Sequence, residues 1–294
     1  MVMEAAGARA VINANKQLRR QASAADRNPV KYNRRRRIFE TTLAVLVPVF
    51  IFGMWQIGSV NGWWDRRLFP APSDVWSSLR FQFSDQDFAT DIGFTVRRMM
   101  WGWLWGCSFG LIFAFVLGLS RTIRAALEPT FNGLYTVPKI ALLPIFLIVF
   151  GFGEKPVIVN IAVTVFFFMW VPIQSAVMGV DTSFREAADS FGSNRWQLFR
   201  HVVFPATLPQ IFVQLRVAAS VAVLSVIGFE FVFAPESRGL GFIINQARQN
   251  FTPKVAYGGV IIAAIIGIVF TSLVRLVGRL VVPWQKEDNA TTGA

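Results

Sequence analysis

Three long stretches of this sequence contain no charged residue, and they constrain its fold more than any other feature. They cover residues 99–119, 157–180 and 255–274. Each reaches the roughly 20 residues that an α-helix needs to cross about 30 Å of bilayer hydrocarbon. Only 16% of all residues are charged, whereas soluble domains use about 25%. The sequence therefore predicts an all-α integral membrane protein.

The polar residue types exclude several kinds of site. The chain has one cysteine, Cys107, and one histidine, His201, too few for an internal disulfide or a four-ligand structural zinc site. His201 lies in an Arg-rich stretch where nothing indicates a catalytic centre. No Gly-Lys pair is present, so the phosphate-binding G-x-x-x-x-G-K loop is missing. We expect this chain to be no enzyme and to bind no metal or cofactor; if ATP drives it, another chain hydrolyses the ATP.

The apolar runs predict about six transmembrane helices. The third contains Pro138, Lys139 and Pro144, so we expect it to be broken or kinked. The second contains Gly102, Gly106, Gly110 and Gly118, and small residues at this spacing let helix backbones approach closely. The expected ranges are 38–60, 96–119, 134–151, 156–180, 205–234 and 255–277.

Basic residues predict how these helices are oriented. With the N-terminus inside, the cytosolic segments hold about twice as many Lys and Arg as the outer segments, which favours two cytoplasmic termini. Residues 1–37 form a basic tail, which we interpret as an anchor beside anionic lipid rather than a nucleic-acid patch. An outer loop with short helices follows the first span at 61–95, a five-helix core covers 96–284, and a second cytosolic tail covers 285–294.

A short polar segment at 180–204, between the fourth and fifth spans, predicts a helical hairpin. Ser183 and Glu186 have the spacing of a capping box, so the first helix is expected to begin at Ser183. Gly192 suits the left-handed position that ends it. Ser193 can cap a second helix that runs through Arg200. Pro205 fits the first turn of the fifth span, so the predicted hairpin at 181–204 continues rigidly into a transmembrane helix.

The residue types of this hairpin suit a docking element. Ala187 and Ala188 give a smooth helix face, and aromatic side chains beside arginines give apolar anchors with a polar rim. An amphipathic hairpin that packs on lipid headgroups is the alternative. The aromatic residues are Phe184, Phe191, Trp196 and Phe199, and the arginines are Arg185, Arg195 and Arg200.

The hairpin resembles a known signature. Glu186-Ala187-Ala188, three residues, Gly192, nine residues and Val202-x-Phe204-Pro205 are similar to the E-A-A-x-x-x-G-x(9)-I-x-L-P motif of binding-protein-dependent ABC importer permeases. Val and Phe stand where Ile and Leu are usual. The resemblance implies the type I importer permease fold, with this loop as the coupling helix that docks into a cleft of the ATPase subunit. The coupling residues it implies are Glu186, Ala187, Ala188, Gly192, Trp196 and Pro205.

Further segments resemble the nitrate/sulfonate/taurine branch of these permeases. They extend the resemblance over about 68–284, and they are 70–76, 118–121, 138–144, 150–154, Glu230, 239–241 and Pro283-Trp284. The branch implies a bacterial cell-membrane importer of two permeases, as a homodimer, with two ATPase subunits that hold ATP and Mg²⁺ and an external solute-binding protein. It also implies a small anion, an aromatic carboxylate or a vitamin precursor as cargo.

Polar residues within the spans are candidates for the translocation pathway, because such residues are costly in a membrane. Arg216 lies about 16 Å along the fifth helix from Pro205, near mid-membrane, where it could attract an anion or pair with a polar neighbour. Glu230 could act at an external gate or form an ion pair with an outer Arg. Lys139 could touch cargo or cap the broken helix. Gln174, Asn160 and Thr164 are further candidates on the fourth span.

A stand-alone secondary transporter or channel is the competing class. Such proteins often have internal repeats and intramembrane carboxylates for ion coupling. This chain has no clear repeat, and Glu230 is its one obvious candidate carboxylate.

Overall fold

The computed structural model describes residues 29–84, 86–233 and 238–284, and helix is the regular secondary structure found there. It divides into two compact units, residues 1–73 and 74–294. The first unit contains α3 (Pro29–Val60), whose part Arg36–Val60 is long and apolar enough to cross a membrane. The Ser59 hydroxyl donates to the Phe69 carbonyl (2.8 Å), which holds the chain that leaves α3. Residues 29–37 of the predicted tail are therefore helical, and its residues 1–28 lie outside the described ranges.

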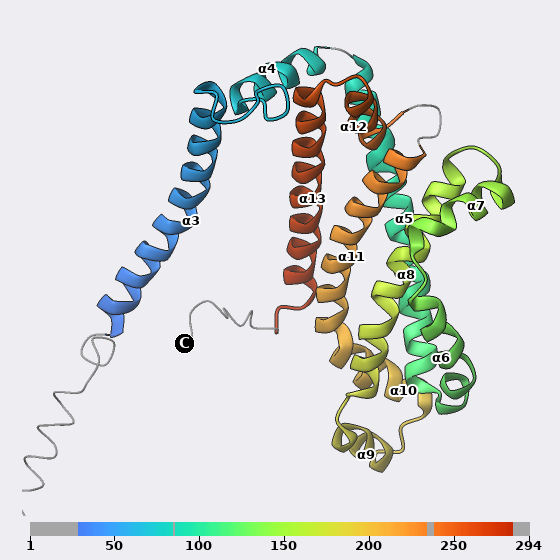
Figure 1. Cartoon of the computed structure of the whole chain (residues 1–294). Coiled ribbons are helices and arrows are strands. Elements are labelled where there is room, and N and C mark those ends of the chain that lie inside the picture. The colour runs from blue at the N-terminus through green and yellow to red at the C-terminus, as the bar shows by residue number, and fades with distance from the viewer. Residues whose placement is uncertain (1–28, 85, 234–237, 285–294) are drawn as a thin grey trace, which may run out of the picture. The chain divides into compact units, whose positions relative to one another are not determined.

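The second unit is a helical bundle (Figure 1). Its elements are α4 (Pro72–Phe83), which begins at the end of the first unit, α5 (Gln86–Leu119), α6 (Arg121–Tyr135), the 3-10 helix η1 (Lys139–Leu142), α7 (Leu143–Phe150), α8 (Glu154–Met178), α9 (Thr182–Ser190), α10 (Arg195–Leu198), the π-helix η2 (Phe199–Val203), α11 (Phe204–Val232), α12 (Leu240–Gln249) and α13 (Pro253–Val281).

Five helices of the described residues satisfy the length and hydropathy of a membrane span, or six if one bent pair counts as a span. The predicted all-α membrane fold is confirmed. The second span begins at Asp87, so the last part of the predicted outer loop 61–95 is helix. The predicted tail at 285–294 lies outside the described residues.

The region of the predicted third span is broken, as expected, and forms a bent helix pair that begins earlier than predicted. Its first arm is α6, which Ser120 caps through a hydrogen bond from the Ile123 amide (3.3 Å). Its second arm, η1 with α7, makes an angle of 94° with the first. The predicted range 134–151 omitted α6 because a segment with the charges of Arg121, Arg124 and Glu128 has a composition typical of a loop. Arg124 instead donates to the carbonyl oxygen of Leu117 (3.1 Å) at the end of α5.

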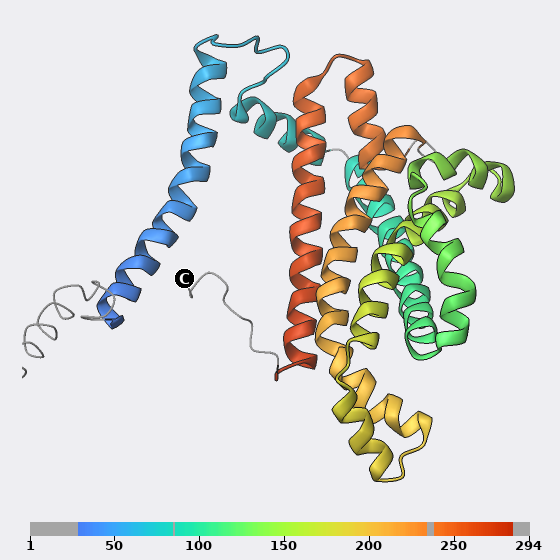
Figure 2. The same cartoon turned by 60° about the horizontal axis from the view of Figure 1, so that its bottom comes forward.

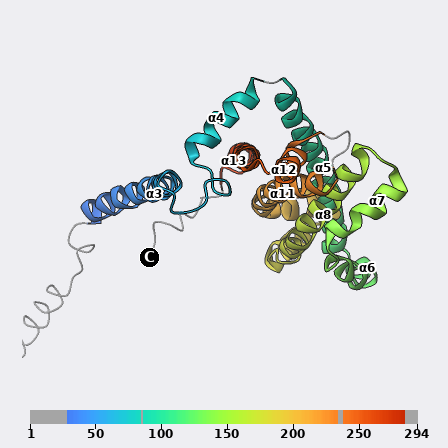
Figure 3. The same ribbon diagram turned by 45° about the horizontal axis from the view of Figure 1, so that its top comes forward.

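Helices α5 and α8 pack closely in parallel, which confirms the role predicted for the glycines of the second span. A Cβ atom at Gly106 would lie 2.6 Å from the Ala162 carbonyl oxygen, and one at Gly110 would lie 2.9 Å from that of Phe166. The backbones therefore approach too closely for any larger residue. In the bundle, α6 and α7 lie beyond α8, and α13 lies beyond α11 on the opposite side (Figure 3).

Candidate functional site

The hairpin begins with a cap that differs from the predicted one. Helix α9 starts at Thr182, and the Asp181 side chain accepts a hydrogen bond from the Ser183 amide (2.9 Å). The predicted capping box of Ser183 and Glu186 is wrong, because Asp181 supplies the capping oxygen two residues earlier. The same bond holds the pKa of the Asp181 carboxyl below its usual value, since it stabilises the charged form.

The turn of the hairpin forms at Gly192, as predicted. Gly192 has a φ of 74°, a left-handed value that favours glycine. The following amide, of Ser193, donates to the Ala188 carbonyl (3.1 Å). The second helix is capped by Asn194, not by Ser193: the Asn194 side chain accepts from the Gln197 amide (2.8 Å), and the Gln197 side chain accepts from the Asn194 amide (2.8 Å).

The second arm of the hairpin does not stop at Arg200 but continues into the membrane. Residues 195–232 are helical throughout, with the π-helical turn η2 joining α10 to α11. Pro205 lies just after this turn and has no amide hydrogen to donate. The Phe204 amide bonds to the Phe199 carbonyl, five residues back, so the wider turn accommodates the proline without a break. The predicted continuity of hairpin and fifth span is confirmed.

The hairpin projects beyond the ends of α8 and α11 that the sequence assigns to the cytosolic side (Figure 2). Several of its aromatic side chains are not covered by the rest of the chain. Phe184, Phe191 and Trp196 are 61%, 89% and 64% exposed. We call these three residues and the exposed Glu186, Ala187, Arg195 and Arg200 the hairpin surface. Ala188 is half-buried beside it.

Two residues predicted for this surface instead attach the hairpin to the bundle. The centre of the Phe199 ring lies 5.1 Å from the centre of the Phe115 ring on α5, in an edge-to-face arrangement. The Arg185 guanidinium donates to the carbonyl oxygen of Val177 (2.8 Å) in the last turn of α8. Arg185 is therefore a support of α9 and not part of a polar rim.

At the other end of the bundle, Glu230 forms a buried ion pair. Its Oε1 accepts a hydrogen bond from Arg98 of α5 (2.8 Å), and the side chains of both residues are 0% exposed. Of the two predicted roles of Glu230, the geometry matches the structural ion pair, since no part of its carboxylate is exposed to a pathway. The sequence did not identify Arg98 as the partner, because Arg97 beside it looks equivalent.

Lys139 caps the break in the third span. Its Nζ donates to the carbonyl oxygens of Tyr135 (2.6 Å) and Val137 (2.7 Å) and lies 4.5 Å from the centre of the Phe167 ring. These contacts satisfy carbonyl groups freed by the bend. The geometry therefore matches the predicted capping role of Lys139 and not contact with cargo.

The candidates on α8 are buried within the bundle. Gln174 accepts from the Trp170 indole and donates to Glu128 of α6 (3.2 Å). The Thr164 hydroxyl donates to the backbone carbonyl of Asn160 (2.8 Å), whose side-chain amide has no hydrogen-bond partner among the described residues. Within this chain, all three residues are buried.

Arg216 differs from the other candidates. It is half-buried on α11, and its Nε atom is buried without a hydrogen-bond partner in the described part of the chain. No ion pair with a carboxylate is found for it there. At the mid-membrane position predicted from the sequence, a guanidinium without a counter-charge is costly, and an anion would be stabilised beside it.

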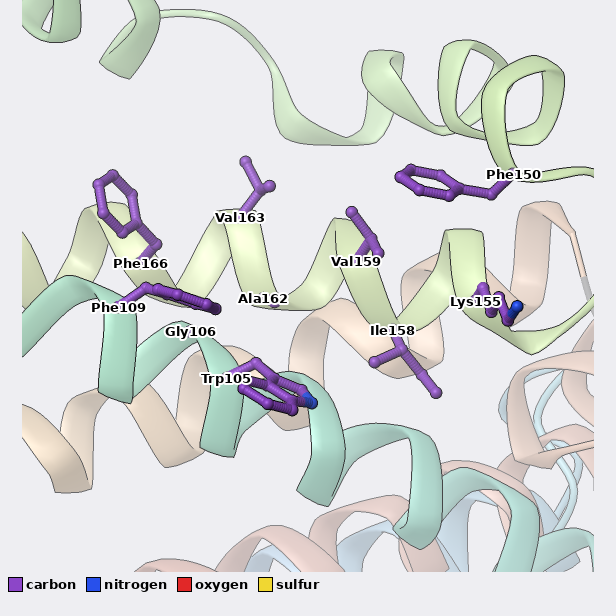
Figure 4. Close-up of a pocket in the computed structure, with 10 residues that line it drawn as sticks. All are labelled: Trp105, Gly106, Phe109, Phe150, Lys155, Ile158, Val159, Ala162, Val163 and Phe166. Atoms are coloured by element: carbon purple, nitrogen blue, oxygen red, sulfur yellow. The ribbon is translucent and has the colours of Figure 1, made fainter.

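A groove of about 560 Å³ lies between α5, α8 and the end of α7. Its lining is apolar apart from Lys155 at one end (Figure 4). Trp105 and Phe109 reach it from α5, and Phe150 reaches it from α7. None of the predicted pathway residues lines this groove, and its apolar character suits hydrocarbon rather than a charged solute.

Comparison with known proteins gives a consistent family. Residues 106–287 match the family model described as binding-protein-dependent transport system inner membrane component. A relative from Bacillus subtilis, the putative aliphatic sulfonates transport permease protein SsuC, is 28% identical over 82% of this chain and 87% of its own length. The Escherichia coli taurine transport system permease protein TauC is 28% identical over 84% and 89%. The nitrate import permease protein NrtB of Leptolyngbya laminosa is 25% identical over 86% and 90%.

Solved structures share the fold at lower identity. A chain of a bacterial ABC transporter that imports the acidic polysaccharide alginate has a TM-score of 0.60 and 16% identity, over 87% of this chain and 96% of that one. A chain of the methionine transporter MetNI, in an inward-facing conformation, has a TM-score of 0.51 and 21% identity, over 63% of this chain and 93% of that one.

Proposed function

Because this chain belongs to the family of binding-protein-dependent transport system inner membrane components, we propose that its hairpin surface is the site where an ATPase subunit docks. The chain is the permease subunit of an ABC importer, a multi-pass membrane protein that forms the translocation pathway and works with ATPase and solute-binding partners. ATP and Mg²⁺ belong to the ATPase in this proposal, and the permease itself catalyses no reaction.

The exposed aromatic residues of the hairpin carry this proposal. Three exposed aromatic side chains on one hairpin, Phe184, Phe191 and Trp196, are unfavourable in water unless a partner covers them, and aromatic anchors with an Arg rim suit a protein interface. A hairpin lying on lipid headgroups would extend sideways along the membrane, whereas this one projects from the ends of α8 and α11 (Figure 2). Its second arm continues into α11, so ATPase motion would reach the membrane through one helix.

The proposal is tested by co-purification of the ATPase with hairpin variants. Phe191→Ala and Trp196→Ala each remove an anchor, and Gly192→Asp places a side chain at a φ of 74°; we expect all three to insert normally and to retain less ATPase. Phe251→Ala is the matched control, because Phe251 is 88% exposed but lies beside α12, away from the hairpin. ATPase retention at the wild-type level in all three variants would refute the docking role, and uptake driven by an ion gradient without ATP would favour a secondary transporter.

We further propose that two copies of this chain form the pore with both termini in the cytoplasm, and that the cargo is a small anion of the sulfonate or nitrate kind. The half-buried Arg216 guanidinium, with no counter-charge among the described residues, supports an anion. The names of the relatives from Bacillus subtilis and Leptolyngbya laminosa support the same class.

The cargo proposal is tested by uptake into vesicles that contain the assembled importer. We expect Arg216→Gln to lower the uptake of labelled alkanesulfonate or nitrate while the ATPase still co-purifies, and Arg216→Lys to restore part of the uptake because the charge remains. Equal uptake by wild type and Arg216→Gln would remove Arg216 from the pathway. Calorimetry of the partner binding protein with the same anions gives an independent identification.

A further inference from the structure

We propose that Arg98 is a positioning residue that joins the outer ends of three helices, so that the hairpin and the outer surface of the permease move together during transport. The inference depends on the proposed function, because it assigns a role in coupling an importer. It rests on the buried polar cluster around Arg98 at the end of the bundle opposite the hairpin.

Arg98 contacts three other segments of the chain while being fully buried. Its Nη1 donates to Glu230 Oε1 near the end of α11 (2.8 Å) and to the carbonyl oxygen of Arg238 in the connection before α12 (2.8 Å). Its Nε lies 3.3 Å from Glu154 Oε1 in the first turn of α8. Arg98 itself belongs to α5, so one guanidinium links α5, α8, α11 and the α11–α12 connection.

The second oxygen of Glu230 fixes the outer connection from the other side. Glu230 Oε2 accepts from the Thr95 hydroxyl (2.8 Å) and from the Gly241 amide (3.1 Å). A Cβ atom at Gly241 would lie 2.5 Å from the Ile227 carbonyl oxygen, so the start of α12 lies directly on α11. The cluster is therefore tightly packed and leaves little room for its segments to move independently.

The position of the cluster gives it a mechanical consequence. Helices α8 and α11 are the two helices that enter and leave the hairpin, and their far ends carry Glu154 and Glu230. The cluster lies about 36 Å from the hairpin along α8, at 1.5 Å per residue. Because the two helices are joined at both ends, a displacement of the hairpin rotates the pair as a rigid body instead of bending one helix. Buried ion pairs add little stability but can fix one arrangement.

The decisive variant is Arg98→Lys in the complete importer with its ATPase and binding protein. Lysine keeps the positive charge beside Glu230, so the complex should assemble, but a single ammonium cannot reproduce the planar fork that reaches Glu154, Glu230 and Arg238 together. We expect normal ATPase co-purification and basal ATP hydrolysis, with the stimulation of ATP hydrolysis by loaded binding protein lowered roughly 5-fold or more. Uptake per ATP should fall in parallel.

Glu154→Gln is the second variant, because it weakens the contact to α8 and leaves the Arg98–Glu230 pair intact. We expect the same loss of stimulation with an unchanged fold. Arg97→Gln is the matched control: Arg97 binds Glu154 from the exposed side, and its loss should leave stimulation near the wild-type level. Wild-type stimulation in Arg98→Lys, or an equal loss in Arg97→Gln, would overturn the inference. Failure of the wild-type chain to bind any ATPase would instead overturn the proposed function.

Discussion

The two ends of α11 differ in how their costly side chains are satisfied. At the end near Glu230, which we propose faces outward, charged side chains are fully buried and satisfied within the chain. Arg98 pairs with Glu230, and the Thr95 hydroxyl and the Gly241 amide donate to the second carboxylate oxygen. At its hairpin end, Phe191 and Trp196 remain exposed. Unpaired charge would be costly inside a membrane, and uncovered aromatic surface is costly in water. The chain thus satisfies the buried charges at the Glu230 end of α11 by itself, and under the proposed function the ATPase covers the hairpin end.

The largest test of this contrast is Arg98→Met, which leaves the Glu230 carboxylate buried without a counter-charge. Removing one member of a buried pair costs about 3–5 kcal/mol, so we expect a large loss of thermal stability in detergent and a low yield of folded protein. The double variant Arg98→Met/Glu230→Met should recover part of this stability, because no charge is left unpaired. A single variant as stable as the wild type would show that the outer end is not completed by this pair.

The next test concerns the packing that connects the two ends. Gly106→Ala places a methyl group 2.6 Å from the Ala162 carbonyl oxygen, so α5 and α8 must separate, at a cost of about 1–3 kcal/mol. Gly93→Ala is the matched control on the same helix, because nothing lies within 4 Å of that position. There alanine should stabilise the helix by about 0.5–1 kcal/mol. Thermal unfolding of both variants measures the difference, and equal shifts would contradict the close approach of the helices.

The hairpin could be predicted from the sequence because its signals are local. Gly192 marked the turn, and its left-handed backbone is observed. The caps were displaced by one or two residues because Asp181 and Asn194 are as good capping residues as Ser183 and Ser193. Only the geometry decides among neighbours of this kind.

The outer cluster could not be predicted, because its contacts are not local. Arg98 and Glu230 are 132 residues apart in sequence, and nothing in the pattern separates Arg98 from Arg97. The start of the third span was missed for a related reason. Glu128 and Arg124 of α6 resemble loop residues until Gln174 and the Leu117 carbonyl are seen to pair with them. Sequence periodicity therefore does not predict which polar groups pair across helices in this fold.

A smaller test separates the observed cap of the second hairpin helix from the predicted one. Asn194→Ala removes the side chain that accepts from the Gln197 amide, which should destabilise the start of this helix by about 0.5–2 kcal/mol. Ser193→Ala should change stability by less than about 0.5 kcal/mol. Hydrogen exchange of amides 195–198 in the whole protein compares the two, and greater exchange in Ser193→Ala would restore the sequence-based assignment.

The smallest expected effect is a pH dependence confined to the first hairpin helix. The Ser183 amide stabilises the charged Asp181 carboxylate and lowers its pKa below the usual value of 3.8. The cap therefore contributes its full stability above pH 3.8 and loses it as the pH falls through the lowered folded-state pKa. Asp181→Asn keeps a capping side chain that does not titrate. We expect protection factors of amides 183–186 to fall in acid in the wild type and to stay level in the variant. Because no buried charge depends on Asp181, protection at the Glu230 end of α11 should be the same in the wild type and in Asp181→Asn at each pH. If Asp181→Asn changed the acid response of both ends, the hairpin would not be the independently exposed element that the contrast between the two ends requires.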